Sequence, residues 1–209
     1  MRLLLASSNA KKLVELRSLL APLALDIVVQ GELGVAEADE PFHSFVENAL
    51  AKARHAARAA GCAAIADDSG LCVHALGGAP GVSSAHFAGY APPRSDRERQ
   101  RAQQDADNNA LLLHRLLGIT DRRAHFSSTL VAIRGADDPE PLIAVGRWPG
   151  EVLTAPRGSG GFGYDPLMFI PALGNTVAAL PAETKNRHSH RALAATQMLQ
   201  LMRDVWHLG

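Results

Sequence analysis

Short apolar runs alternate with an amphipathic segment over the first thirty residues. Residues 2–6 and 25–30 have the length and composition of short strands. Between them, segment 10–20 has leucines spaced three and four residues apart, as on one face of a helix. Pro22 marks the end of that helix. The pattern therefore predicts a strand, a helix and a second strand in this order.

A long alanine-rich helix is predicted next. Ser44 and Glu47 form a capping box at its start, and Gly61 closes it. The preceding segment, residues 31–42, has no hydrophobic period and is predicted to be a loop. Its acidic residues are Glu32, Glu37, Asp39 and Glu40. This loop could bring a carboxylate toward acids elsewhere in the chain, and a solvated acidic loop is equally compatible with the sequence.

Two adjacent acids interrupt the apolar sequence that follows. Apolar runs at 62–66 and 71–76 flank the segment Asp67-Asp68-Ser69-Gly70, which has the composition of a turn. We therefore expect a hairpin with Asp67 and Asp68 at its tip. Two carboxylates between buried strands are costly unless their charge is offset. Mg²⁺ could offset it, since this ion is held by one or two carboxylates together with substrate phosphates. An ordinary solvated turn is the alternative.

The C-terminal half contains two further predicted helices and a predicted hairpin. Ser95 and Glu98 form a second capping box, which opens a helix that is polar at first and apolar later. Residues 124–134 and 141–148 have strand composition, and the turn-rich segment between them suggests a hairpin. The last helix has a core-facing stripe formed by Ala192, Ala195, Leu199, Met202 and Trp206.

A polar turn between the first strand and the first helix is a candidate anion site. Ser8 or Asn9 can cap the helix, whose first backbone amides have no partner within the helix. Lys11 and Lys12 add positive charge beside these amides. A plain capped helix with solvated lysines is the alternative.

A second unusual stretch is the glycine-rich segment 157–166. Gly158, Gly160 and Gly163 satisfy the pattern G-x-G-x-x-G, but Pro166 follows at once and no helix begins there, so we reject a Rossmann nucleotide site. A glycine-rich loop can still let the backbone approach a ligand closely. Aromatic side chains in this loop, Phe162 and Tyr164, offer a stacking face. The chain has no Walker sequence, which argues against a P-loop NTPase.

A dense polar cluster, residues 180–191, precedes the last helix. Its cations gather at or before the helix N-terminus, where they oppose the helix dipole unless an anion lies among them. These cations and imidazoles are Lys185, Arg187, His188, His190 and Arg191.

Composition restricts the classes of function. The 209 residues are 47% hydrophobic and 20% charged, as expected for one globular domain, residues 1–209, with two lobes. The 21 Lys and Arg residues equal the 21 Asp and Glu residues, so no overall basic field favours nucleic acid. Cys62 and Cys72 match no metal-binding spacing and suit a reducing compartment. No apolar run is long enough to span a membrane, and the N-terminal run is too short for a signal peptide. We therefore expect a soluble, cytoplasmic protein.

Four motifs in one order resemble those of a known family. The family is that of the noncanonical purine nucleoside triphosphate pyrophosphatases, also called inosine triphosphate pyrophosphatases. The resemblance covers essentially the whole chain. The motifs are SSNAKK at 7–12, SFVENALAKA at 44–53, ADDSGLCVHALGGAPGVSSAHFAG at 66–89, and GGFGYDP at 160–166 together with ETKNRHSHR at 183–191.

The resemblance implies a fold and a reaction. The fold is a two-lobed α/β structure around a long mixed β-sheet flanked by helices, and it forms a homodimer. The reaction is the Mg²⁺-dependent hydrolysis of ITP, dITP or XTP to the monophosphate and pyrophosphate, which removes these nucleotides from the pool used to make nucleic acids. No nucleic acid or membrane partner is implied.

The resemblance also implies roles for individual residues. Asp68 is the general base and a metal ligand, and either Asp39 or Glu40 is the second ligand. The remaining matched positions are expected to contact the substrate: Ser7, Ser8, Asn9, Ala10, Lys11, Lys12, Ser69, Phe162, Gly163, Tyr164, Asp165, Lys185, His190 and Arg191. Asn9 and Lys12 would hold phosphate, whereas the residues from Phe162 onward would form the nucleotide site.

The chain departs from the family pattern at two places. Ser7-Ser8 stands where the family has Thr-Gly, and Thr184 stands where an acid is common. Two other functions remain open: a nucleotide sensor without catalytic activity, and a pyrophosphatase for modified pyrimidine nucleotides. A sensor would not need Asp67 and Asp68 intact, and product analysis separates the two enzymes.

Overall fold

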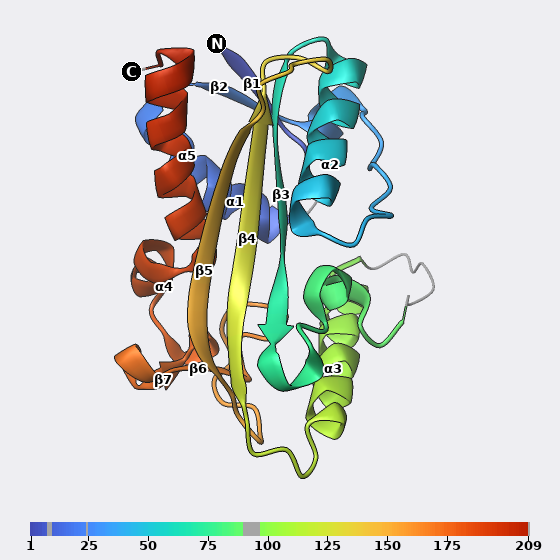
Figure 1. Cartoon of the computed structure of the whole chain (residues 1–209), viewed down its shortest axis with the longest axis vertical. Coiled ribbons are helices and arrows are strands. Elements are labelled where there is room, and N and C mark those ends of the chain that lie inside the picture. The colour runs from blue at the N-terminus through green and yellow to red at the C-terminus, as the bar shows by residue number, and fades with distance from the viewer. Residues whose placement is uncertain (8–9, 24, 90–96, 209) are drawn as a thin grey trace. The chain divides into compact units, whose positions relative to one another are not determined.

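The computed structural model describes residues 1–7, 10–23, 25–89 and 97–208, without the side chains of residues 10–12 and 97. The strands are β1 (Arg2–Leu5), β2 (Asp26–Val29), β3 (Ala63–Val73), β4 (Arg123–Ile133), β5 (Leu142–Val152), β6 (Met168–Ile170) and β7 (Asn175–Thr176). The α-helices are α1 (Ala10–Leu20), α2 (Phe45–Ala60), α3 (Arg97–Arg115), α4 (Ala182–His188) and α5 (His190–Trp206) (Figure 1).

The described strands form one mixed sheet in the order β2-β1-β3-β4-β5-β6-β7. Strand β1 pairs in parallel with both β2 and β3, whereas β6 pairs antiparallel with β5 and with β7. An α/β fold around a long mixed sheet is therefore confirmed.

The chain divides into two compact units, each assembled from separate segments. The first contains Met1–Asp68, Ser128–Arg147 and Asn186–Gly209, and the second contains Ser69–Ser127 and Trp148–Lys185. Strands β3, β4 and β5 each contribute residues to both units. The division is consistent with the two lobes expected from the sequence.

In the first unit, helices cover both faces of the sheet. Side chains alternate between the two faces of a strand, so neighbouring residues join different cores. Leu3, Leu5 and Ile65 pack with residues of α1 and α5, whereas Leu4 and Ala64 pack against the alanine-rich face of α2. Figure 1 shows α2 on the other side of the strands from α1 and α5.

Helix α5 approaches β5 unusually closely. A Cβ atom at Gly146 would overlap the carbonyl oxygen of His190 and crowd the amide of Ala194, so this position admits no side chain. One residue earlier, the backbone N–H of Val145 donates to Gln197 Oε1 at 2.7 Å. These contacts fix the first two turns of α5 against the strand.

The second unit has its own apolar core. Leu112 of α3 and Leu116, which directly follows this helix, pack with Leu71 of β3, Tyr164 and other buried residues of this unit. Tyr164 is buried, and its hydroxyl donates to the backbone carbonyl of Ser84 at 3.0 Å. Burial, together with the nearby Asp105 carboxylate, raises the pKa of Tyr164. This side chain is therefore part of the core.

Most elements lie where the sequence predicts them. Helix α1 spans the predicted segment, and α2 begins after Ser44, whose hydroxyl accepts from the N–H of Glu47. Gly61 ends α2 in the left-handed conformation, with φ of 63°. The predicted cap Ser95 lies outside the described residues. The sequence did not predict α4, which contains Lys185.

The predicted hairpin at 62–76 is wrong. Residues 63–73 form one continuous strand, β3, and Asp67 and Asp68 are buried in its middle, 3% and 5% exposed. The prediction assumed that two adjacent carboxylates must mark a turn. Instead, each finds buried hydrogen-bond donors, which offset its desolvation.

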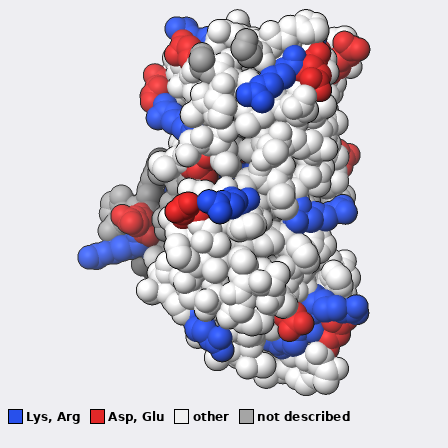
Figure 2. Space-filling model, turned by 90° about the vertical axis from the view of Figure 1, so that its left-hand side faces the viewer, with Lys and Arg blue, Asp and Glu red and all other residues white. Residues whose placement is uncertain are grey.

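The surface and the thiols agree with the composition. On the face drawn in Figure 2, charged side chains of both signs are interspersed, in keeping with the equal numbers of acidic and basic residues. Cys62 and Cys72, both among the described residues, are not joined in a disulfide bond. Among the helices of the described residues, none is both long and apolar enough to cross a membrane.

Candidate active site

Asp68 receives donors from two residues of α2. Its Oδ1 accepts from Lys52 Nζ at 3.0 Å, and its Oδ2 accepts from Asn48 Nδ2 at 3.4 Å. Asn48 and Lys52 are four residues apart, so they lie on the same face of the helix. Helix α2 thus presents an amide and an ammonium group to one carboxylate.

Lys52 also joins this carboxylate to the acidic loop. Its Nζ donates to Glu40 Oε2 at 3.1 Å, so the carboxylates of Glu40 and Asp68 share one cation. Burial alone would lower the pKa of Lys52, but the charges of Asp68 and Glu40 outweigh it and the pKa is raised. Lys52 is therefore a permanent ammonium ion at neutral pH.

Asn48 holds the end of the acidic loop in place. Its Oδ1 accepts from the N–H of Phe42 at 3.0 Å, and its Nδ2 donates to the carbonyl of Phe42 at 3.2 Å. Because the same amide donates to Asp68, a single buried side chain links the loop to β3. Asp39 and Glu40 are both exposed, but Glu40 reaches the Lys52 ammonium group.

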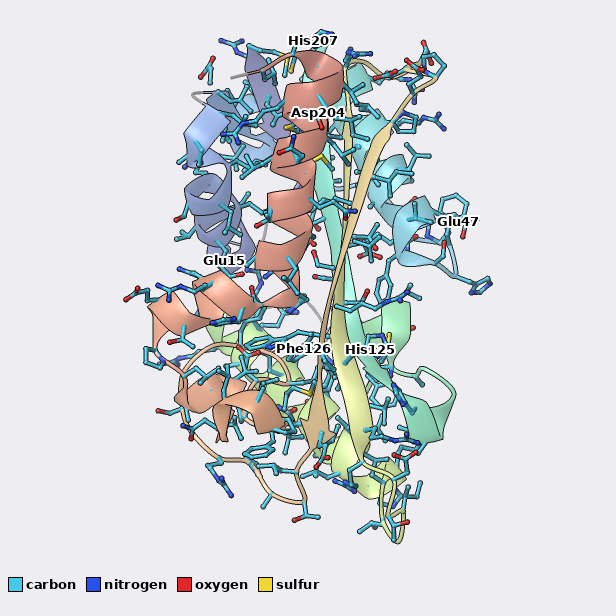
Figure 3. All side chains as sticks on the ribbon, turned by 60° about the vertical axis from the view of Figure 1, so that its left-hand side comes forward. Glu15, Glu47, His125, Phe126, Asp204 and His207 are labelled. Atoms are coloured by element: carbon cyan, nitrogen blue, oxygen red, sulfur yellow. The ribbon has the colours of Figure 1, made fainter. Side chains whose placement is uncertain are left out.

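Asp67 belongs to a different network. Its Oδ1 accepts from Ser128 Oγ at 2.6 Å, and its Oδ2 accepts from Arg191 Nη2 at 3.3 Å. Arg191, only 1% exposed, also pairs through Nη1 with Glu15. Figure 3 shows Glu15 on α1 beside the N-terminal end of α5, which begins at His190. Burial would lower the pKa of Arg191, but Asp67 and Glu15 raise it.

In the second unit, the glycine-rich loop is closed by Asp165 and Lys185. Asp165 Oδ2 accepts from the N–H of Phe162 at 3.0 Å and from Lys185 Nζ at 2.9 Å. The same Nζ lies 4.5 Å from the centre of the Phe162 ring, which is a cation–π contact. Gly161 has φ of 77°, and a Cβ there would overlap the Asp165 carboxylate, so this turn requires glycine.

The predicted site residues differ in burial and in whether the structure describes them. Ser7 and Ser69 are half-buried, and His190 is buried in the first turn of α5. Ser8 and Asn9 lie outside the described residues, as do the side chains of the first three residues of α1, which are Ala10, Lys11 and Lys12. Phe162, Gly163, Asp165 and Lys185 lie together in the second unit, whereas His190 and Arg191 belong to the first.

The sequence reasoning missed four residues of these networks. Asn48 and Lys52 lie within the SFVENALAKA motif, and their spacing of four residues on a helix was a usable signal. Glu15 and Ser128 had no such signal. They reach Arg191 and Asp67 from positions far away in the sequence, through contacts that only the fold creates.

The chain has close relatives of nearly the same length. It is 72% identical over 206 residues to the dITP/XTP pyrophosphatase of Methylibium petroleiphilum, covering 99% of both chains. It is 68% identical over 212 residues to the dITP/XTP pyrophosphatase of Leptothrix cholodnii, covering both chains completely.

Solved structures give the same result. The HAM1 protein from Coxiella burnetii is 38% identical, with a TM-score of 0.88, and the match covers 98% of this chain and 100% of that one. The Ham1 protein of Staphylococcus aureus is 32% identical, with a TM-score of 0.83 and coverage of 98% and 99%. Residues 3–201 match the Ham1 family. The chain is therefore a member of the Ham1 family.

Proposed function

We propose that this protein hydrolyses purine nucleoside triphosphates with an unusual base, such as ITP, dITP and XTP, to the monophosphate and pyrophosphate. Such a reaction removes these nucleotides before they are incorporated into nucleic acid. The observation that carries the proposal is the convergence of Asp68 and Glu40 on the Lys52 ammonium group, 3.0 and 3.1 Å away. The names of the relatives, dITP/XTP pyrophosphatases, support the choice of substrate.

The same carboxylates fit Mg²⁺. Within the part of the chain that the structure describes, no set of three or more His, Cys, Asp or Glu side chains is placed to hold a metal ion. Two carboxylates are nevertheless enough, because Mg²⁺ completes its shell with water and substrate phosphates. Asp68 and Glu40 both contact the Lys52 ammonium group, so the two carboxylates lie close enough to approach one cation together. We therefore assign Glu40 as the second ligand, because it contacts the same ammonium group as Asp68.

The chemistry would follow from these charges. When bound, Mg²⁺ supplies Lewis-acid polarisation of the phosphoryl oxygens. Asp68 takes the proton of the water that attacks the α-phosphorus, a contribution of roughly 10²–10⁴-fold. Lys52 remains protonated and adds positive charge for the phosphates. The backbone amides after Asn9, with Lys12, neutralise the departing pyrophosphate.

Base recognition is assigned to residues of each unit separately. In the second unit, Phe162 offers the stacking face, and it is surrounded by Gly163, Asp165 and Lys185. The Tyr164 side chain is buried in the core and is not expected to stack on the base. Ser69, His190 and Arg191 are further proposed contacts. Arginine carries only donors, which suit the 6-keto oxygen of inosine and xanthosine.

We further propose that residues 1–209 act as a single pyrophosphatase domain, that the protein forms a homodimer in the cytoplasm, and that it has no nucleic acid or membrane partner. Gel filtration with light scattering tests the dimer. A molecular mass near twice the 22.2 kDa of the chain is expected.

A nucleotide panel tests the function. ITP, dITP, XTP, GTP, ATP and modified pyrimidine triphosphates are incubated with Mg²⁺, and pyrophosphate, phosphate and monophosphate are measured separately. We expect pyrophosphate and the monophosphate from ITP, dITP and XTP. Release of phosphate alone, or a preference for pyrimidines, would contradict the proposal. Tight binding without turnover would indicate a sensor instead.

A further inference from the structure

The polar part of α3 carries four inward-facing side chains that apolar packing does not explain. They occupy two pairs of adjacent positions one helical turn apart and so share one face of the helix. Of these, Gln104 and Asn108 are buried, 9% and 2% exposed. The four are Gln104, Asp105, Asn108 and Asn109.

One member of each pair holds residues 84–89, which form the end of the motif at 66–89. Asn108 Nδ2 donates to the carbonyls of Ser84 and Ala85 at 3.2 and 3.1 Å, and its Oδ1 accepts from the N–H of Ala88. Gln104 Nε2 donates to the carbonyl of Gly89 at 3.0 Å. These contacts order the backbone of residues 84–89.

The other member of each pair holds a single glycine. Asp105 Oδ2 accepts from the N–H of Gly163 at 2.7 Å, and Asn109 Nδ2 donates to its carbonyl at 2.9 Å. Gly163 has φ of 63° and separates Phe162 from Tyr164. Both polar groups of this one residue are thus tied to the helix.

Other contacts of the loop have a different effect. The contacts among Phe162, Asp165 and Lys185 fix these groups relative to one another. On the C-terminal side of Gly163, the Tyr164 hydroxyl donates to the carbonyl of Ser84. Asp105 and Asn109 fix the glycine itself to a helix that Leu112 already packs into the core. Hydrogen bonds from α3 to Gly163 therefore hold the backbone segment that carries Phe162.

We propose that Asp105 and Asn109 are positioning residues that set the place of the Phe162 ring and the Asp165 carboxylate for the purine base. The inference rests on the proposed function, since it assumes that this loop contacts the nucleoside. The two residues themselves need not touch the substrate.

The variants Asp105→Ala and Asn109→Leu test this assignment. Each removes one bond to Gly163, and Asp105→Asn keeps an acceptor oxygen as the conservative rescue. Asp107→Ala is the matched control, because Asp107 is exposed on the same helix and accepts from Gln103. We expect KM for dITP to rise roughly tenfold in the first two variants, with a smaller change in kcat, because a displaced base-binding group weakens binding of the substrate and of the transition state alike.

A second readout does not depend on turnover. Hydrogen exchange of the Gly163 amide, measured by NMR or on peptides covering residues 158–165, should accelerate in Asp105→Ala and remain at the wild-type rate in Asp107→Ala. Asp105→Asn should restore most of both the protection and the KM.

The outcomes are separable. Faster exchange at Gly163 with an unchanged KM for dITP would overturn the positioning role, as would a lowered melting temperature without any change in KM. If wild-type protein releases no pyrophosphate from any purine triphosphate, the proposed function fails. In that case, loss of IMP binding by calorimetry in Asp105→Ala, but not in Asp107→Ala, would still support the positioning role, and equal binding would overturn it.

Discussion

Asp67 and Asp68 are neighbours in β3 but belong to networks on opposite faces of the sheet. Asp67 continues the row of Ala63 and Ile65, which face α1 and α5, and it meets Arg191. Asp68 continues the row of Ala64 and Ala66, which face α2, and it meets Lys52. Because side chains alternate along a strand, two adjacent acids are given two separate roles.

Substitution of Asp68 by Asn should lower pyrophosphate release by at least about 10²-fold, since it removes a general base and a metal ligand together. The structure also predicts a cost in stability of about 1–3 kcal/mol, because the amide replaces an acceptor that is buried beside Lys52. Steady-state kinetics and thermal denaturation measure the two effects. Asp39→Asn is the control, and near-wild-type turnover by Asp68→Asn would refute its catalytic role.

The two candidate metal ligands in the acidic loop can be compared directly. Glu40→Gln should increase the Mg²⁺ concentration needed for half-maximal activity, whereas Asp39→Asn should leave it near the wild-type value. The reason is that Glu40 shares the Lys52 ammonium group with Asp68. Mg²⁺ titrations of both variants decide the question. A larger effect in Asp39→Asn would reverse the assignment.

The Lys52 pair makes a pH-dependent contribution to stability. The pKa of Lys52 is raised above its ordinary value of 10.5, so the folded state binds the proton more tightly than the unfolded state. Its stabilisation is therefore fully present below pH 10.5 and is lost as the pH rises through the folded pKa. Wild-type protein and Lys52→Met should differ in melting temperature by a constant amount from pH 7 to 9, and the gap should narrow above pH 10.5. A gap that widened there would contradict this account.

The Arg191 network should be essential for stability as well as for substrate selection. Arg191→Ala leaves the carboxylates of Asp67 and Glu15 without this guanidinium, which should cost about 3–5 kcal/mol of the free energy of unfolding. Glu15→Ala should cost less, because Arg191 retains Asp67. The double variant should fall short of the sum, since the two residues are in contact. Urea denaturation of the three variants provides the comparison.

Selectivity is then measured at a temperature at which Arg191→Ala remains folded. If Arg191 donates to the 6-keto oxygen, kcat/KM should fall more for ITP than for ATP. Equal losses for both nucleotides would place Arg191 near the phosphates instead. GTP also carries this oxygen, so its rejection requires contacts to the 2-amino group.

The sequence alone determined the local elements and the family. Leucine spacing predicted α1, a capping box and Gly61 bounded α2, and the last helix followed its apolar stripe. These features depend on propensities and caps within a few residues, which the sequence displays directly. The ordered motifs were equally visible, and they led to the correct family.

Tertiary structure decided the surroundings of the acids. Asp67 and Asp68 resembled a turn because their donors are distant in sequence: Ser128 lies 61 residues away from Asp67, and Arg191 lies 124 residues away. Likewise, Asp105 and Asn109 of α3 meet Gly163, which lies 58 and 54 residues further on, and nothing near them in the sequence indicates this contact. A buried polar group is tolerated only when its hydrogen bonds are satisfied. Whether such partners exist depends on how strands and helices pack, and this information lies in no local window of the chain.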